Sequence, residues 1–191
     1  MSIDSKLIET AYTLCTFLDK QADKLLPQEI AGVVKTHSKL AVASAWVPVP
    51  GADVAAGAVT IWTMYCRINS KIGLKVSDNI LKTVASGVAT NLVSYAAMAG
   101  IASSLKFIPG IGSVGGALLM SASLYAITLT AGYVYLEALC LLAGRKGKDF
   151  NLDDISEVIK EVLANKKLLK DFFKAAKQSY KKDENTLDKT K

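Results

Sequence analysis

The pattern of hydrophobic and polar positions divides this chain into an uncharged middle and two amphipathic ends. Phe107 to Leu136 is a run of 30 residues without a charged side chain, and Thr83 to Leu105 is a second run of 23. About 20 apolar residues suffice to cross a bilayer, yet Gly, Ala, Ser and Thr supply about half of the longer run. Because small residues allow close helix packing in a membrane bundle and in a soluble core alike, the longer run fits either setting.

The shorter run predicts a helix capped by Ser77 or Asp78. Its Asn91 and several Ser and Thr side chains would be unfavourable toward lipid, but they find hydrogen-bond partners in a protein interior. We therefore expect these side chains inside the protein.

The N-terminal third predicts two amphipathic helices. Apolar residues recur at helical spacing over residues 7–26, with Asp4 or Ser5 as the cap and Pro27 after the end. A second helix is expected from Gln28 to about Trp46.

Two breaks rich in proline and glycine each precede a long apolar helix. Proline denies the helical conformation to the residue before it, so we expect one helix to start near residue 52 and run to Gly73, and another to start near residue 112 and end near Gly144. The residues that define the breaks form a structural motif and a candidate interaction site: Pro48, Pro50, Gly51, Asp53, Pro109, Gly110 and Gly112.

Asp53 is the acid of the first break. In the first turn of a helix a carboxylate accepts unpaired N–H groups and complements the helix dipole. We interpret Asp53 as such a helix-start acid, and the alternative is a contact with a cation or a partner.

The C-terminal segment changes character after Gly144. A basic linker, residues 145–148, is followed by apolar stripes over residues 155–163 and 169–176. A basic amphipathic helix either lies on an anionic membrane or docks on the body with its lysines in water, and we favour docking. The lysines that could contact a membrane surface are Lys166, Lys167, Lys170, Lys174 and Lys177.

Composition fits one helical domain over residues 1–182, with a basic amphipathic part at 145–182 and a disordered tail at 183–191. The chain has 191 residues, 51% of them hydrophobic. A net charge of +6 could serve anionic lipid or nucleic acid, but a lysine-rich surface explains it, so we expect no nucleic-acid partner. The N-terminus has acids where an export signal would be basic, so we expect a protein that is not secreted.

Candidate chemistry is sparse. Cys15, Cys66 and Cys140 stand far apart among apolar residues, which favours buried thiols over disulfides or zinc ligands. His37, the only histidine, lies on or beside an apolar stripe and is expected to be a core or boundary residue. The GxGxxG pattern at 110–115 lacks the strand that a dinucleotide site needs. We expect no enzyme, and no catalytic, cofactor or metal site.

The central residues resemble a known family. Over about residues 45–144 the chain is similar to the helical domain of unknown function 697, which accompanies Era-like GTPases. The matching features are Val47 to Asp53, Met64, Ile72-Gly73, Lys106 to Gly115, and Thr130 to Gly132 before Glu137. A weaker likeness is to the helical parts of immunity-related GTPases. The resemblance implies an all-α, membrane-associated accessory module without catalytic residues. Because this chain carries no GTPase motif, a GTPase partner would be a separate protein.

The sequence therefore predicts an all-α helical bundle, in which a central apolar hairpin of Pro/Gly-started helices is wrapped by amphipathic N- and C-terminal helices. The first functional hypothesis is a non-enzymatic accessory protein in the cytoplasm or at the cytoplasmic membrane. Its expected partners are membrane lipid, a GTPase in trans and further copies of itself. The alternatives are a soluble binding or scaffold module and, third, a colicin-like latent pore former.

Overall fold

The computed structural model describes residues 2–18, 20, 25–44, 52–98, 113–147, 150 and 152–187, and near several helix ends it describes the backbone alone. All regular elements in these ranges are helical, which confirms the predicted all-α class. In chain order they are α1 (Ile3–Phe17), α2 (Leu25–Ser44), α3 (Ala52–Ile72), α4 (Asp78–Met98), α5 (Ser113–Lys146), the 3₁₀ turn η2 (Leu152–Asp154), α6 (Ile155–Ala164) and α7 (Lys166–Leu187).

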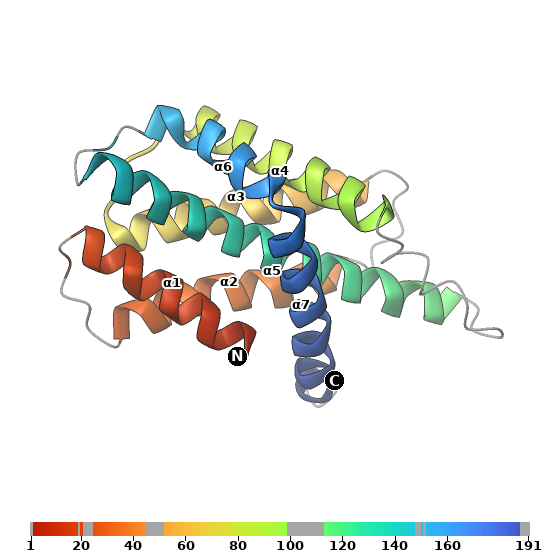
Figure 1. Cartoon of the computed structure of the whole chain (residues 1–191). Coiled ribbons are helices and arrows are strands. Elements are labelled where there is room, and N and C mark those ends of the chain that lie inside the picture. The colour runs from red at the N-terminus through yellow and green to blue at the C-terminus, as the bar shows by residue number, and fades with distance from the viewer. Residues whose placement is uncertain are drawn as a thin grey trace.

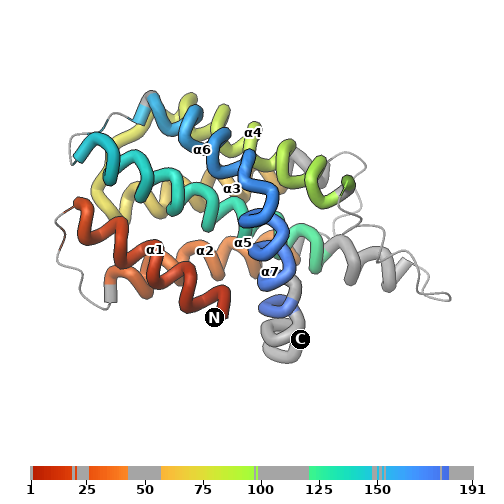
Figure 2. Tube along the Cα trace, in the orientation of Figure 1, coloured from red at the N-terminus to blue at the C-terminus, as the bar shows by residue number. Residues whose placement is uncertain are grey.

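The bundle is built around α5 (Figure 1). Helices α1 and α2 lie along one side of α5, α3 and α4 lie along the other, α6 lies beside α4, and α7 crosses in front. Figure 2 traces the same path and shows both terminal regions closing over α5. A helical bundle with one long apolar helix wrapped by the chain ends is therefore confirmed.

The second uncharged run lies largely in α4, which, unlike α5, is buried on one face only. Helix α4 buries one face, but Ser86, Thr90, Asn91 and Ser94 are exposed on the other. The expectation that Asn91 and its hydroxyl neighbours lie in the interior is wrong. These side chains hydrate readily in water, so an uncharged run of Ser, Thr and Asn does not have to be covered by protein.

The N-terminal helix boundaries differ from those predicted. Helix α1 ends at Phe17, and the hydroxyl of Ser2 caps it by accepting the backbone N–H of Ser5 at 3.1 Å. Pro27 lies inside the first turn of α2 instead of ending a helix. A proline costs little there because a first-turn N–H has no partner within the helix. No Gly or Pro occurs between Leu18 and Leu25, so the apolar spacing alone could not reveal the break.

The C-terminal end of α5 also differs from the prediction. The helix continues past Gly144 to Lys146, and Gly147 adopts a positive φ of 75°. The N–H of Gly147 donates to the carbonyl of Ala143 at 2.9 Å, as a left-handed capping residue does. Gly144 instead lies within the helix against Phe17. The predicted basic linker therefore supplies the last turn of α5, where cations complement the helix dipole.

The remaining boundaries agree with the sequence pattern. Helix α3 begins at Ala52 and is followed by Gly73, whose φ is 72°. The apolar stripes of α6 and α7 are buried as predicted, from Ile155 to Leu163 and from Leu169 to Ala176. The α7 backbone is helical to Leu187, and the last four residues of the predicted tail lie outside the described residues.

The buried histidine and the cysteines behave as ordinary core groups. His37 is 2% exposed and shares a hydrogen bond of 2.8 Å between Nδ1 and the carbonyl of Val33, which confirms a satisfied core histidine. Burial, opposed by that hydrogen bond and reinforced by Arg67, lowers the pKa of His37. Cys15 and Cys140 are buried and Cys66 is partly buried, all three as free thiols, as expected.

Candidate functional site

Helix α5 is the feature that any function must accommodate. Each residue from Leu124 to Leu136 is buried. Within the span from Ser121 to Lys146, the most apolar window has a mean hydropathy of 1.6, and 89% of that window is buried in the bundle. Among the described residues it is the one helix long and apolar enough to cross a membrane. The same properties belong to the core helix of a soluble protein, so the helix by itself does not distinguish the two.

The two Pro/Gly-started helices, α3 and α5, meet at a buried pair of tyrosines. The rings of Tyr65 and Tyr135 stack with centroids 4.0 Å apart. Tyr65 donates its hydroxyl to the carbonyl of Ala131 at 3.0 Å, and Tyr135 donates to Oδ1 of Asn69 at 2.9 Å. Burial raises the pKa of both hydroxyls, so both remain neutral hydrogen-bond donors. These two hydrogen bonds fix the position of α5 relative to α3.

Helix α2 approaches α5 at a glycine. A methyl group built on Gly132 would clash with Cγ1 of Val34 and lie 3.2 Å from Sδ of Met64. Such separations are shorter than ordinary van der Waals contacts, so only glycine permits this packing. Gly132 belongs to the Thr130 to Gly132 segment that carries part of the family resemblance, and its role here is close helix contact.

One end of the bundle is nearly free of charge in the stretches that the structure describes. The C-terminal end of α2, the N-terminal half of α3, the C-terminal part of α4 and the N-terminal part of α5 all reach this end (Figure 1). Asp53 is the one charged residue within these four stretches, which are residues 40–44, 52–66, 83–98 and 113–136. We call these four stretches the uncharged end. Three large apolar side chains are exposed there: Leu40 at 54%, Val59 at 56% and Met98 at 76%.

The basic face of α7 lies on the outside of the bundle. Lys166, Lys167, Lys170 and Lys174 are exposed, while Leu169, Phe172 and Phe173 are buried. This confirms docking of α7 on the body with lysines in water. Lys166 also places its ammonium 5.7 Å from the ring centroid of Tyr95, close to the end of α4 that belongs to the uncharged end. The side chain of Lys177 lies outside the described residues.

A cavity of about 480 Å³ lies between α1 and the C-terminal part of α5. Its polar lining comes from Glu9, Thr10, Thr13, Tyr133, Glu137, Cys140 and Arg145. Burial raises the pKa of Glu137, and a hydrogen bond from Tyr133 partly opposes that rise. Burial, with Glu137 nearby, raises the pKa of Tyr133 to about 12 and that of Cys140 to about 12.

These groups offer little chemistry. The Cys140 thiol stays protonated at neutral pH and donates to the carbonyl of Thr10 at 3.2 Å, whereas a thiol nucleophile must be a thiolate. The bases that line the cavity are the carboxylates of Glu9 and Glu137, and the nearby Glu137 raises the thiol pKa further. Among the described residues, no group of three or more His, Cys, Asp or Glu side chains is arranged to hold a metal ion.

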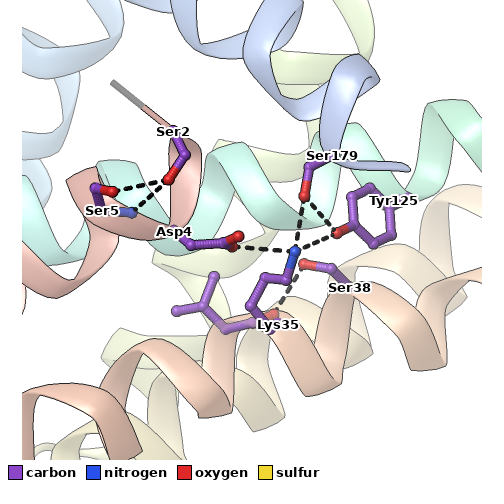
Figure 3. A network of polar contacts seen from close by, with 8 residues as sticks. Ser2, Asp4, Ser5, Lys35, Ser38, Tyr125 and Ser179 are labelled. Atoms are coloured by element: carbon purple, nitrogen blue, oxygen red, sulfur yellow. Dashed lines mark hydrogen bonds and ion pairs between the residues drawn. The ribbon is translucent and has the colours of Figure 1, made fainter. Parts of the chain in front are cut away.

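A polar cluster around Lys35 was not predicted from the sequence (Figure 3). The Lys35 ammonium donates to the hydroxyls of Ser179 at 2.7 Å and Tyr125 at 2.9 Å, and forms an ion pair with Asp4 at 3.1 Å. A distance of 3.2 Å joins the two hydroxyls. The four residues come from α2, α7, α5 and α1. Lys35 alone has no distinguishing sequence context, because each partner lies at least 31 residues away.

Most residues of the predicted interaction motif cannot be placed. Pro48, Pro50, Gly51, Pro109, Gly110 and Gly112 lie outside the described residues. The backbone of Asp53 occupies the first turn of α3, as expected, and its side chain is not described. The role of Asp53, as a helix-capping acid or as a contact with a cation or partner, therefore stays a prediction.

Comparison with known proteins gives one informative relative. Magnetosome membrane protein 22 of Magnetospirillum gryphiswaldense is 30% identical over 106 residues, which cover 55% of this chain and 54% of that protein. The chain thus spans about half the length of that relative. No family model matches the chain, and no solved structure matches it.

Proposed function

We propose that this chain is a non-enzymatic accessory protein that associates with the cytoplasmic membrane through the uncharged end of its bundle. The observation that carries the proposal is that the four described stretches of the uncharged end contain one charged residue, Asp53, while Leu40, Val59 and Met98 are exposed. A surface that faces water normally carries charged side chains, so an uncharged surface with apolar side chains suggests an interaction site.

The exposed polar groups set the depth of this association. Ser86, Thr90, Asn91 and Ser94 on α4 are costly in hydrocarbon but well suited to the hydrated headgroup layer. The association proposed is therefore peripheral, with α5 remaining in the bundle. The relative that is named as a membrane protein supports a membrane location, and so does the resemblance to a membrane-associated helical domain.

Added charge on α4 tests this proposal. Thr90→Lys and Ser94→Lys place a cation on the uncharged end at exposed positions, where the fold should tolerate them. Asn79→Lys is the matched control, because it adds the same charge at an exposed site near the start of the same helix. Flotation with uncharged phosphatidylcholine vesicles should recover the parent chain and the control, and lose the two variants. Equal recovery of all three variants would contradict the proposal.

A soluble scaffold is the second candidate, because 89% of the most apolar window of α5 is already buried. Cell fractionation followed by carbonate and high-salt washes separates the candidates. Recovery of the whole protein in the soluble fraction would favour the scaffold. Dye release from vesicles would instead indicate the latent pore former.

The resemblance further leads us to infer a GTPase partner in trans. Affinity purification from native membranes, with and without a non-hydrolysable GTP analogue, tests this partner. A GTPase whose recovery depends on the analogue would support the inference, and recovery without any GTPase would contradict it.

A further inference from the structure

The ammonium group of Lys35 joins the two ends of the chain to the centre of the bundle. A lysine ammonium has three N–H donors, and three acceptors on three other helices surround this one: Asp4, Tyr125 and Ser179 (Figure 3). The Lys35 side chain is 20% exposed and Tyr125 is fully buried. The charge-assisted hydrogen bonds to the buried hydroxyls of Tyr125 and Ser179 are stronger than bonds at the surface, whereas Asp4 is 56% exposed and its ion pair contributes less. We call these four residues the Lys35 latch.

The latch secures the far half of α7. Nearer its start, α7 packs through aromatic pairs: Phe173 lies 5.6 Å from Tyr95, and Phe172 stacks on Tyr133 at 4.0 Å. Ser179 lies further along the helix, and its neighbour Tyr180 packs edge-on against Tyr125 at 5.4 Å. Lys35 therefore holds the second half of α7 at Ser179.

Helix α7 combines features that suit a second location. Its inner face is apolar and aromatic, and its outer face carries four exposed lysines in the first nine residues, against one acid, Asp171. A basic amphipathic helix of this kind binds anionic bilayers with its apolar face in the interface and its lysines among the headgroups. The exposed lysine face of α7 is therefore complementary in charge to an anionic lipid surface.

We propose that the Lys35 latch holds α7 on the bundle and that α7, when released, transfers to an anionic lipid surface. The inference rests on the proposed membrane association, because the uncharged end would bring α7 close to the headgroups. To the proposed membrane association, the inference adds that the lipid is anionic and that the Lys35 latch restrains α7. Lipid phosphates attract the exposed lysines of α7 and so favour its release, whereas the latch favours its place on the bundle. The strength of the latch therefore sets how readily α7 leaves α5.

Lys35→Met tests the latch in water, since methionine is also unbranched, is only one atom shorter and lacks the three donors. Lys71→Met is the matched control: it breaks the exposed ion pair between Lys71 and Glu29, 2.8 Å long, which joins α3 to α2. Hydrogen exchange measured by mass spectrometry without lipid should be about tenfold faster or more in α7 and α1 of Lys35→Met. The control should match the parent chain. Unchanged exchange of α7 in Lys35→Met would overturn the latch.

Vesicle binding tests the transfer to lipid. Lys35→Met should bind vesicles of equal parts phosphatidylcholine and phosphatidylserine several-fold more tightly than the parent chain, and added Lys170→Glu and Lys174→Glu should abolish that gain. High salt should weaken the gain by screening. Faster exchange without tighter binding to these vesicles would overturn the transfer of α7.

Two further results keep the inference separate from the proposed function. If the parent chain fails to float with phosphatidylcholine vesicles while Lys35→Met still gains affinity for anionic vesicles, the latch stands and the uncharged end is not a membrane site. If Lys35→Met does not fold, Ser179→Ala and Asp4→Asn each remove one acceptor and should accelerate exchange in α7 and α1, respectively. Parent-like exchange in both of these variants would overturn the latch.

Discussion

The two uncharged runs of this chain look alike in composition and occupy opposite kinds of position. On α5 every side chain from Leu124 to Leu136 is buried, whereas α4 exposes a continuous face that includes Thr90 and Ser94. Gly132 of α5 allows close contact with α2, while the described serines and threonines of α4 face outward. Absence of charge therefore has two separate causes in one protein: burial on all sides for α5 and, as we propose, a membrane surface for α4.

The largest expected effect comes from the same substitution at one threonine of each run. Thr130 is fully buried on α5 and donates to the carbonyl of Ala126 at 2.7 Å, whereas Thr90 is exposed on α4. Thr130→Lys buries an unpaired charge and should cost about 4 kcal/mol or more, or prevent folding. Thr90→Lys should stay within about 0.5 kcal/mol of the parent. Urea unfolding measures both, and similar losses would show that the two faces do not differ in burial.

Glycine substitutions give the next effect, with opposite signs on the two helices. Gly132→Ala forces a methyl group against Val34 and should destabilise the fold by about 1–3 kcal/mol. Gly87→Ala meets no atom within 4 Å and should stabilise α4 by about 0.5–1 kcal/mol, because alanine loses less backbone entropy. The free energy of unfolding of each variant checks the contrast, and a gain at Gly132 would mean that α2 and α5 can separate without cost.

Removal of a tyrosine hydroxyl should matter more on α5 than on α4. Tyr135→Phe leaves Oδ1 of buried Asn69 without its donor and should cost about 1–3 kcal/mol. Tyr95→Phe loses a bond to the Lys166 carbonyl that is 3.4 Å long and partly buried, so its cost should be about 0.5 kcal/mol or less. Thermal unfolding of both variants measures the difference, and a larger loss at Tyr95 would contradict it.

The smallest effect concerns Glu137, the first charged residue of α5. Burial raises its pKa, so the folded state favours the protonated carboxyl. The resulting stabilisation is present at pH values below the ordinary pKa and is lost as the pH rises through the raised value. Glu137→Gln should therefore raise Tm at pH 7 by about 2 °C or less, and the gain should vanish near pH 4. A gain that is independent of pH would point to packing in place of ionisation.

Part of the candidate site could be predicted from the sequence and part could not. The uncharged stretches, the starts of α3 and α5 near proline and glycine, and the basic outer face of α7 are local patterns, and they appear where the pattern indicates. The Lys35 latch depends on four helices meeting at one point, and nothing around Asp4, Lys35, Tyr125 or Ser179 marks that meeting in the sequence.

The sequence alone determined the helical class, the apolar stripes of α6 and α7, and the core location of His37, because these follow from a period of 3.6 residues and from the cost of burying polar groups. Only the tertiary structure decided which uncharged run lies at the centre, that Pro27 begins a helix instead of ending one, and that Gly147 caps α5 in place of Gly144. The physical reason is that hydrophobic periodicity records how much apolar surface each helix must bury. The partner that covers this surface is set by the fit between side chains far apart in the chain, such as Gly132 against Val34 and Tyr65 against Tyr135.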